Sequence, residues 1–286
     1  MNKIGIDFGG TKIEGILLDK NFDVIKRKRV STPYNYNSIL HTIRDLIFNL
    51  KIESNDLTTI GIGIPGTYSS KTGIITHSNT PCIIGKHFQK NLEDLIDQKI
   101  LIENDANCFA LSESKMGAGK NFNIVLGIII GTGVGSGIVI DGKILNGKNN
   151  FSGEWGHHSI FPDGKLCYCG RRGCLDQYIS GPSLEQNWTE LTGKKESLPN
   201  IIQNIVGDEA LEWKSNFLKF FGIGMANMIN ILDPDIIVLG GGISNISFLY
   251  DEGIKSINNE LSYNTDTPIV KNQLGDSSGV FGACLL

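Results

Sequence analysis

The sequence has 286 residues, 40% of them apolar, so it can build one large core or two moderate ones. Its net charge is −4, and its one strongly basic run, Lys26-Arg27-Lys28-Arg29, is better explained as the solvated face of an early strand than as a nucleic-acid surface. No apolar run reaches the roughly 20 residues of a membrane span, and Asp7 interrupts the N-terminal apolar stretch where a signal peptide would have its core, so we expect a soluble cytoplasmic protein.

The first third of the chain alternates strand and helix patterns. In chain order, the expected elements are a strand beginning at Ile4, strands at 13–18 and 23–25, a helix at 37–50, and strands at 59–64 and 99–102. In the helix, apolar residues recur at helical spacing from Leu40 to Leu50. The Pro65-Gly66 pair ends the fourth strand as a turn.

The second half repeats this theme. It has an expected strand at 124–130, a glycine turn, a second strand and a hairpin turn at Asp141-Gly142. A loop-rich insert at 149–177 and a polar connecting region at 187–204 follow, then a helix at 209–232 with an apolar stripe from Leu211 to Leu232 and a buried strand at 235–239. We therefore predict two related α/β domains with a cleft between them.

Two glycine-rich turns carry the strongest chemical signal. Glycine accounts for 35 of the 286 residues, which is well above the usual share of about 7%. Gly9-Gly10-Thr11-Lys12 and Gly131–Gly137 each join one strand to another strand, which excludes the dinucleotide motif that opens a helix, and no Walker loop is present. Either turn alone could be an ordinary hairpin. Two of them, with Gly240-Gly241-Gly242 after a third strand, predict backbone N–H groups that hold phosphates and therefore an ATP-using phosphotransferase.

Asp105 follows a buried strand in Glu103-Asn104-Asp105-Ala106-Asn107. A carboxylate there suits a general base that accepts a hydroxyl proton, and neighbouring amides could bind substrate hydroxyls. The same residues could equally cap a helix. The position at the carboxyl end of a strand favours the functional interpretation.

A third cluster has the composition of a structural metal site. His157 precedes Cys167, Cys169 and Cys174, and one imidazole with three thiolates matches a closed tetrahedral zinc site. The alternative is a set of unrelated thiols. The remaining cysteines are scattered and are interpreted as small buried hydrophobes; they are Cys82, Cys108 and Cys284.

Together these motifs resemble the ROK family (repressors, open reading frames, kinases) over nearly the whole chain. Asp7-x-Gly9-Gly10-Thr11-Lys12 resembles its first phosphate loop, 103–107 its catalytic segment, and 131–137 its second phosphate loop. The stretch from Gly153-Glu154-Trp155-Gly156-His157 to Cys174-Leu175-Asp176 resembles its signature, in which glycine, histidine and three cysteines stand in register.

The resemblance implies a two-domain actin/hexokinase-like (ribonuclease H-like) ATPase fold with the active site in the interdomain cleft. The expected domains are 1–107, with 275–286 as a helix that could return to it, and 108–274, which carries the zinc-binding insert 149–177. The implied ligands are ATP, Mg²⁺, structural Zn²⁺ and a hexose, and the implied assembly is a homodimer without nucleic acid or membrane.

The resemblance also assigns roles to single residues. Asp105 is implied to take the proton from the sugar 6-hydroxyl. The implied sugar contacts are Asn79, Asn104, Glu154, His157 and Asp176. The residues implied around the phosphates and magnesium are Asp7, Gly9, Gly10, Thr11, Lys12, Gly131, Thr132 and Gly133. Gly240, Gly241 and Gly242 are implied to lie near the adenosine. Zinc is implied at His157, Cys167, Cys169 and Cys174, with the second nitrogen of His157 on the sugar.

One position departs from the family pattern. The family typically has glutamate two positions after the last cysteine, and here Asp176 is one methylene shorter. The residues 274–283 and Cys167-Tyr168-Cys169 resemble the fructokinase/mannokinase branch, which makes fructose the first candidate substrate. Glucokinase and N-acetylglucosamine or N-acetylmannosamine kinase activities remain alternatives.

Two other classes of function fit the sequence less well. A transcriptional repressor of this family needs a DNA-binding domain before the first phosphate loop, and here the first strand begins at Ile4 in an acidic chain. A non-catalytic sugar sensor would need a broken base or phosphate loop, and Asp105 and both loops are intact.

Overall fold

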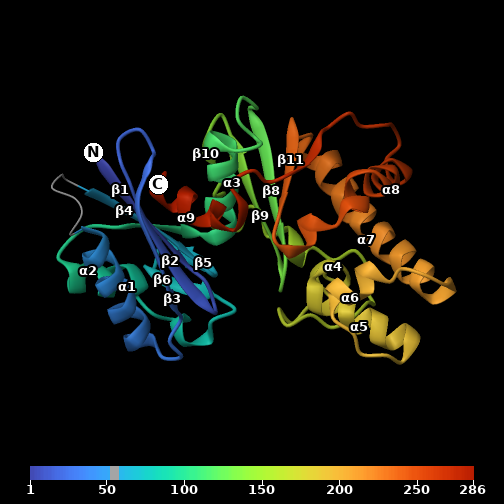
Figure 1. Cartoon of the computed structure of the whole chain (residues 1–286), viewed down its shortest axis with the longest axis horizontal. Helices are drawn as coiled ribbons and strands as arrows, with labels where there is room; N and C mark the ends of the chain where they lie inside the picture. Colours follow the sequence, from blue (N-terminus) through green and yellow to red (C-terminus); the bar gives the residue numbers. More distant parts are fainter. Residues whose placement is uncertain (52–57) are drawn as a thin grey trace.

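Two α/β halves make up the fold, and each is built on a five-stranded sheet (Figure 1). The computed structural model describes residues 1–51 and 58–286. In spatial order, the first sheet contains β3 (Val24–Ser31), β2 (Lys12–Leu18), β1 (Asn2–Phe8), β4 (Thr58–Ile64) and β7 (Leu101–Asn104). The second contains β10 (Lys143–Ile144), β9 (Val134–Ile140), β8 (Ile124–Ile130), β11 (Ile236–Gly240) and β12 (Ile269–Lys271).

The two sheets have the same strand order and the same strand directions. In each, three antiparallel strands are extended by two parallel strands on the side of the first strand. β1 therefore corresponds to β8, and the β1–β2 hairpin corresponds to the β8–β9 hairpin. Because the two glycine turns join equivalent strands, the predicted repeat of strand, glycine turn and strand is confirmed.

Helices α1 (Tyr36–Lys51) and α2 (Phe88–Ile96) pack in the first half, beside a small hairpin of β5 (Thr67–Ser69) and β6 (Ile74–His77). The helix expected at 37–50 is confirmed, and its predicted apolar residues are buried at the spacing of one helix face. The sequence interpretation missed α2. Phe88, Leu92 and Ile96 recur every four residues and are its buried positions.

Helices α3 (Asp105–Met116) and α9 (Ser278–Cys284) lie between the two sheets, where green and red ribbon meet in Figure 1. α3 packs against β8 and β9, and α9 packs against β1 and β4. The C-terminal helix is therefore in contact with the first sheet, as the return of 275–286 would require. The domain bounds themselves stay a prediction.

The two helices also cross each other closely, and glycines allow this approach. A Cβ added to Gly282 would lie 1.8 Å from the backbone oxygen of Cys108 on α3. A Cβ on Gly61 of β4 would lie 1.9 Å from the backbone oxygen of Ala283. Real Cβ atoms do not approach a backbone oxygen this closely, so glycine is required at both positions.

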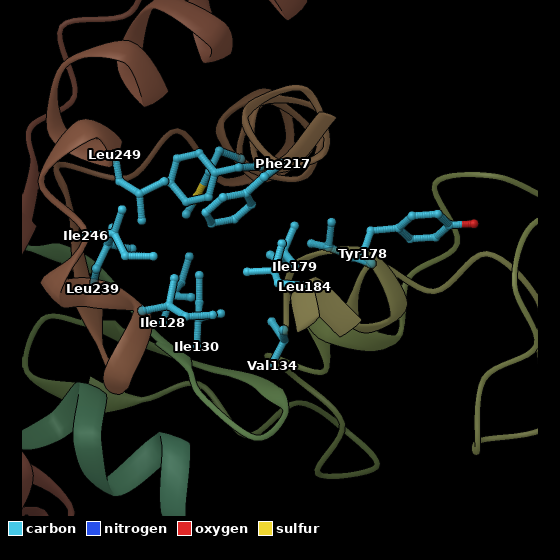
Figure 2. Packing of buried hydrophobic residues seen from close by; sticks show 14 of the residues in the cluster. Ile128, Ile130, Val134, Tyr178, Ile179, Leu184, Phe217, Leu239, Ile246 and Leu249 are labelled. Atoms are coloured by element: carbon cyan, nitrogen blue, oxygen red, sulfur yellow. The ribbon is translucent and has the colours of Figure 1, made fainter. Parts of the chain in front are cut away.

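In the second half, helices cover a core of aromatic and branched side chains (Figure 2). The helices are α4 (Asp176–Ile179), α5 (Gly181–Thr192), α6 (Leu198–Gln203), α7 (Asp208–Leu232) and α8 (Glu252–Glu260). The helix expected at 209–232 is confirmed. Within its predicted apolar stripe Phe217, Phe221 and Met225 are buried, but Leu211 is 56% exposed, so its assignment to the core is wrong.

The region 187–204 is more ordered than expected. Its polar sequence predicts a connecting segment, yet it contains the end of α5 and all of α6, and Ile201 is fully buried. Short helices of this kind depend on packing more than on their own sequence pattern. No helix in the described ranges is long and apolar enough to cross a membrane.

Candidate active site

The first glycine turn closes the β1–β2 hairpin. The backbone N–H of Gly9 donates to the carbonyl of Lys12 (3.0 Å), and the Thr32 hydroxyl donates to the carbonyl of Gly9 (2.7 Å). These bonds fix the turn while Gly10, Thr11 and Lys12 stay exposed. The exposed backbone and the Lys12 ammonium form a surface suited to an anion, as the sequence predicts.

Asp7 lies at the end of β1, directly opposite Glu14 of β2 in the hairpin register. Burial raises the pKa of Asp7 to about 7, and the carboxylates of Asp105 and Glu14 act in the same direction. Three carboxyl groups therefore gather at the turn from β1, β2 and the start of α3. Such a cluster is stabilised by a nearby cation, which fits the magnesium predicted beside Asp7.

Glu14 is a functional candidate that the sequence interpretation missed. Its side chain is 1% exposed and pairs with Arg27 (Nε to Oε1, 3.0 Å) and Arg29 (Nη2 to Oε2, 2.9 Å). The basic run on β3 is largely solvated, as expected, but two of its arginines reach inward to this buried carboxylate. Counting residues outward from the glycine turn places Glu14 opposite Asp7 and could have found it.

Asp105 is the first residue of α3, directly after β7. Asn104 is the N-cap: its side-chain oxygen accepts from the N–H groups of Ala106 (2.9 Å) and Asn107 (3.2 Å). The capping interpretation is thus confirmed for Asn104, and it fixes Asp105 at the helix start. Burial raises the pKa of Asp105 to about 6, and the Glu154 carboxylate acts in the same direction. A carboxylate with this pKa is suited to accept a hydroxyl proton near neutral pH.

The predicted sugar contacts come from different elements. Asn104 also donates its side-chain amide to the carbonyl of Gly66 (3.2 Å). Asn79 is exposed in the segment before Pro81, and Thr80 beside it approaches Gly10. Glu154 is exposed, and its carboxylate accepts from the Thr67 hydroxyl (3.4 Å).

Asp176 is held by the second glycine turn. Its Oδ1 accepts from the N–H of Val134 (2.9 Å), Oδ2 accepts from Gln177 (3.2 Å), and the side chain is 4% exposed. Burial raises the pKa of Asp176. The shorter aspartate thus has one oxygen committed to the backbone of the turn, which links the end of the cysteine-rich insert to β9.

The predicted metal ligands converge. One ligand atom from each of His157, Cys167, Cys169 and Cys174 lies within 4.8 Å of the others. Cys167 Sγ is 3.6 Å from His157 Nδ1, and Cys169 Sγ is 3.5 Å from Cys174 Sγ. Tetrahedral bonds of about 2.0–2.3 Å give ligand-to-ligand distances of this size. The donor set and its spacing therefore fit a zinc ion.

The second nitrogen of His157 already has a partner. Tyr168 Oη lies 2.9 Å from His157 Nε2, and the two rings meet edge to face with centroids 5.0 Å apart. The direct sugar contact predicted for this nitrogen would have to share it with Tyr168 or displace Tyr168. The sequence interpretation gave Tyr168 no role, because the contact depends on how the insert folds.

The second glycine turn borders a cavity of about 540 Å³. Gly131, Thr132 and Gly242 lie on its wall, and a Cβ added to Gly131 or Gly242 would meet no atom within 4 Å. α5, α6 and the segment after Gly242 supply the rest of the lining, which is Gly181, Pro182, Glu185, Leu198, Pro199, Ile202, Gln203, Ile243, Asn245 and Ile246. This largely apolar wall beside a glycine turn suits a purine base next to its phosphates.

The three glycines at the end of β11 (Ile236–Gly240) have different surroundings. Gly242 is open to the cavity, and Gly241 has a φ of 78°, which glycine tolerates best. Gly240 is buried, and a Cβ there would meet the ring of Phe109 at 2.5 Å. Gly240 thus lets α3 pack on β11 and is not among the residues of the cavity wall, and its place near the adenosine stays a prediction.

A family model described as the ROK family matches residues 3–286. The chain belongs to the ROK family. It is 38% identical over 296 residues to an N-acetyl-D-glucosamine kinase of Vibrio atlanticus (strain LGP32), and the match covers 99% of this chain and 98% of that relative. An N-acetyl-D-glucosamine kinase of Vibrio cholerae serotype O1 is 36% identical with the same coverage. The predicted family is confirmed.

Solved structures of ROK proteins share the fold. A ROK hexokinase from Thermus thermophilus superimposes with a TM-score of 0.91 at 27% identity, covering 100% of this chain and 97% of that chain. A ROK family glucokinase from Streptomyces griseus, solved with glucose and AMPPNP, gives a TM-score of 0.83 at 27% identity and covers 99% and 98%. The predicted two-domain hexokinase-like fold is confirmed.

Proposed function

We propose that this ROK protein is an ATP-dependent kinase that phosphorylates the 6-hydroxyl of a hexose. The observation that carries the proposal is the placement of Asp105. Asp105 lies at the start of α3, where burial together with the Glu154 carboxylate of the signature segment raises its pKa, while its own charge raises the pKa of Asp7 beside the first phosphate loop. Named relatives that match almost the whole chain are sugar kinases, which supports the same activity.

In the proposed reaction, Asp105 accepts the proton of the 6-hydroxyl as that oxygen attacks the γ-phosphorus. A new O–P bond forms, the bond from phosphorus to the β-phosphate oxygen breaks, and ADP leaves. The exposed backbone of 9–12 and 131–133 would hold the phosphates, and Lys12 would add positive charge. Asp7 would hold magnesium, which supplies charge neutralisation for the phosphates when bound.

The insert is proposed to hold a structural zinc ion through His157, Cys167, Cys169 and Cys174. With four protein ligands no position remains for water, so the ion would fix the insert and not take part in the chemistry. Its role would be to hold His157 beside Glu154 and Asp176. A homodimer is proposed from the family resemblance alone, and the cytoplasmic location expected from the sequence stays a prediction.

The relatives and the family resemblance favour different sugars as the preferred substrate. Relatives at 36–38% identity are N-acetyl-D-glucosamine kinases, which makes N-acetyl-D-glucosamine the leading substrate in place of fructose. Fructose remains the second candidate because of the resemblance of 167–169 and 274–283 to the fructokinase/mannokinase branch.

The test is sugar-dependent ADP release with Mg-ATP against fructose, mannose, glucose, N-acetylglucosamine and N-acetylmannosamine. We expect a clear winner whose product carries phosphate on C6, with N-acetylglucosamine ahead of fructose. Sugar binding without ADP release on any member of the panel would refute the kinase and favour the sensor. A higher kcat/KM for fructose would refute the leading substrate only.

A further inference from the structure

Glu113 in α3 is a fully buried carboxylate to which the proposed reaction gives no part. Each of its two oxygens accepts two hydrogen bonds. The donors are the N–H groups of Ala118 (2.9 Å), Gln273 (3.1 Å) and Leu274 (3.0 Å) and the hydroxyl of Ser278 (2.9 Å). Burying a carboxylate is costly unless its oxygens are paired, so this side chain can stay in the interior only while the donors surround it.

The four donors lie on both connections between the two halves. The chain passes from the first sheet to the second along α3 and 117–123, and Ala118 lies on this path. It returns along 272–277 to α9, and the other three donors lie on this path or at the first residue of α9. Glu113 therefore ties the two connections together, where α3 and α9 pack against each other between the sheets (Figure 1).

The start of α9 that Glu113 holds lies against the carboxyl group of Asp7. Ser278 is the first residue of α9, and Gly279 follows it. A Cβ added to Gly279 would lie 3.2 Å from both Cγ and Oδ2 of Asp7. The backbone at this point therefore supports the side chain proposed to hold magnesium, and a shift of Ser278 would reach Asp7 through one peptide unit.

Asp7 also lies close to the start of α3. It pairs with Gly63 of β4 in the parallel register of the first sheet. A Cβ added to Gly63 would lie 3.8 Å from the Cα of Asp105. Asp7 thus adjoins the start of α9 directly and the start of α3 across one strand. The position of Asp105 relative to Asp7 then depends on how the two helices are fixed to each other.

We propose that Glu113 is a positioning residue for phosphoryl transfer. By bonding α3 to the start of α9, its carboxylate fixes the base Asp105 relative to Asp7, which holds the magnesium. Displacing a reacting group by about 1 Å can lower a rate by about 10²-fold, so a loosened junction slows the reaction in a folded protein. The inference rests on the proposed hexose kinase function and deepens it.

The experiment compares Glu113→Gln, Ser278→Ala and the protein with both changes. A glutamine amide has one oxygen and one NH₂ group, so two of the four donors lose their acceptor whichever way the amide turns. Ser278→Ala removes a single bond and is the milder change. The matched control is Glu93→Gln in α2, since Glu93 also accepts a backbone hydrogen bond, from the N–H of Ile100 (3.0 Å), but within the first half alone.

Phosphoryl transfer is measured in a single turnover with Mg-ATP and the sugar that the wild type uses best. Calorimetry gives the affinity and stoichiometry of sugar binding, at a temperature where thermal unfolding shows each protein to be folded. Glu113→Gln is expected to slow transfer about 10–100-fold and Ser278→Ala about 3–10-fold. The double variant should match Glu113→Gln within about twofold, because both changes break the same contact.

Sugar affinity should stay within about threefold of the wild type in all three variants, because the carbonyl of Gly66 holds Asn104 from within the first half. Glu93→Gln should lower the melting temperature and leave the transfer rate unchanged. This separation of rate from affinity distinguishes a positioning role from a general loss of stability.

Transfer at the wild-type rate by folded Glu113→Gln would overturn the inference, because the carboxylate would then only stabilise the fold. A fall in sugar affinity as large as the fall in rate would also overturn it. If Glu113→Gln does not fold, Ser278→Ala decides: slowed transfer supports the inference and an unchanged rate overturns it. Wild-type protein that phosphorylates no sugar would instead defeat the proposed function, and this inference with it.

Discussion

The crossing of α3 and α9 gives a sharp test of how the two halves are held together. Gly282→Ala adds a methyl group whose nearest neighbours are the backbone O, C and Cα of Cys108, at 1.8, 2.4 and 2.7 Å. Alanine alone would favour a helix by about 1 kcal/mol over glycine. Here the neighbouring atoms belong to the backbone of α3 and cannot shift without moving the helix, so α3 and α9 must move apart.

Forced overpacking typically costs about 1–3 kcal/mol, and a clash with backbone lies at or beyond the upper end. After the helix-propensity gain, we expect the free energy of unfolding to fall by about 2 kcal/mol. At roughly 2–4 °C per kcal/mol for a chain of this size class, the melting temperature should fall by about 4–8 °C. Activity should fall as well, because α3 carries Asp105 at its first position.

Thermal unfolding of the ligand-free protein measures this effect. Gly253→Ala in α8 is the matched control, because its added methyl would meet the Phe221 ring edge at 3.1 Å, a side chain that can tilt. The control should change the melting temperature little. A Gly282→Ala protein that melts at or above the wild-type temperature would refute the packing argument.

Three further predictions follow from the site. Asp105 has to be ionised to accept a proton, so kcat/KM should rise through about pH 6 and level off above it; a flat profile between about pH 5 and about pH 8 would contradict this. Verified zinc removal should disorder the insert 149–177 and abolish calorimetric sugar binding, and retained affinity would count against the structural ion. Replacing both Arg27 and Arg29 by alanine should lower the free energy of unfolding in denaturant by about 1–2 kcal/mol, a value reduced for solvent screening because both arginines are over 40% exposed. Adding Glu14→Gln should restore part of this loss, because it removes the buried charge left unpaired. No recovery would mean that the unpaired carboxylate is not the cause.

Local patterns predicted those parts of the fold that depend on neighbouring residues. The two glycine hairpins, α1 and α7 follow from spacing within one segment, and the metal cluster follows from cysteines within eight positions. Local patterns did not predict the helices in the region 187–204. These helices are stabilised by packing against the core of the second half, so the polar sequence has no helix signal of its own.

The site was predicted less completely, because part of it is made by contacts between distant segments. The partners of Glu14 come from β3, and Ser277 near the C-terminus also donates to it (3.3 Å). The glycine motifs marked Gly131, Thr132 and Gly242 on the cavity wall, but much of the rest of the wall comes from α5 and α6, which no motif marked. Tyr168 adjoins two predicted metal ligands in sequence, but its contact with His157 depends on the path of the insert.

The central claim is that Asp105 acts as the base and does not merely support the fold. The decisive measurement compares wild-type protein with Asp105→Asn for sugar affinity by calorimetry and for phosphoryl transfer in a single turnover. Loss of a general base lowers the rate by about 10²–10⁴-fold. We predict a loss of that size with sugar affinity within about tenfold, since one hydrogen bond is at stake. Full transfer by Asp105→Asn, with zinc and ATP bound, would contradict the account.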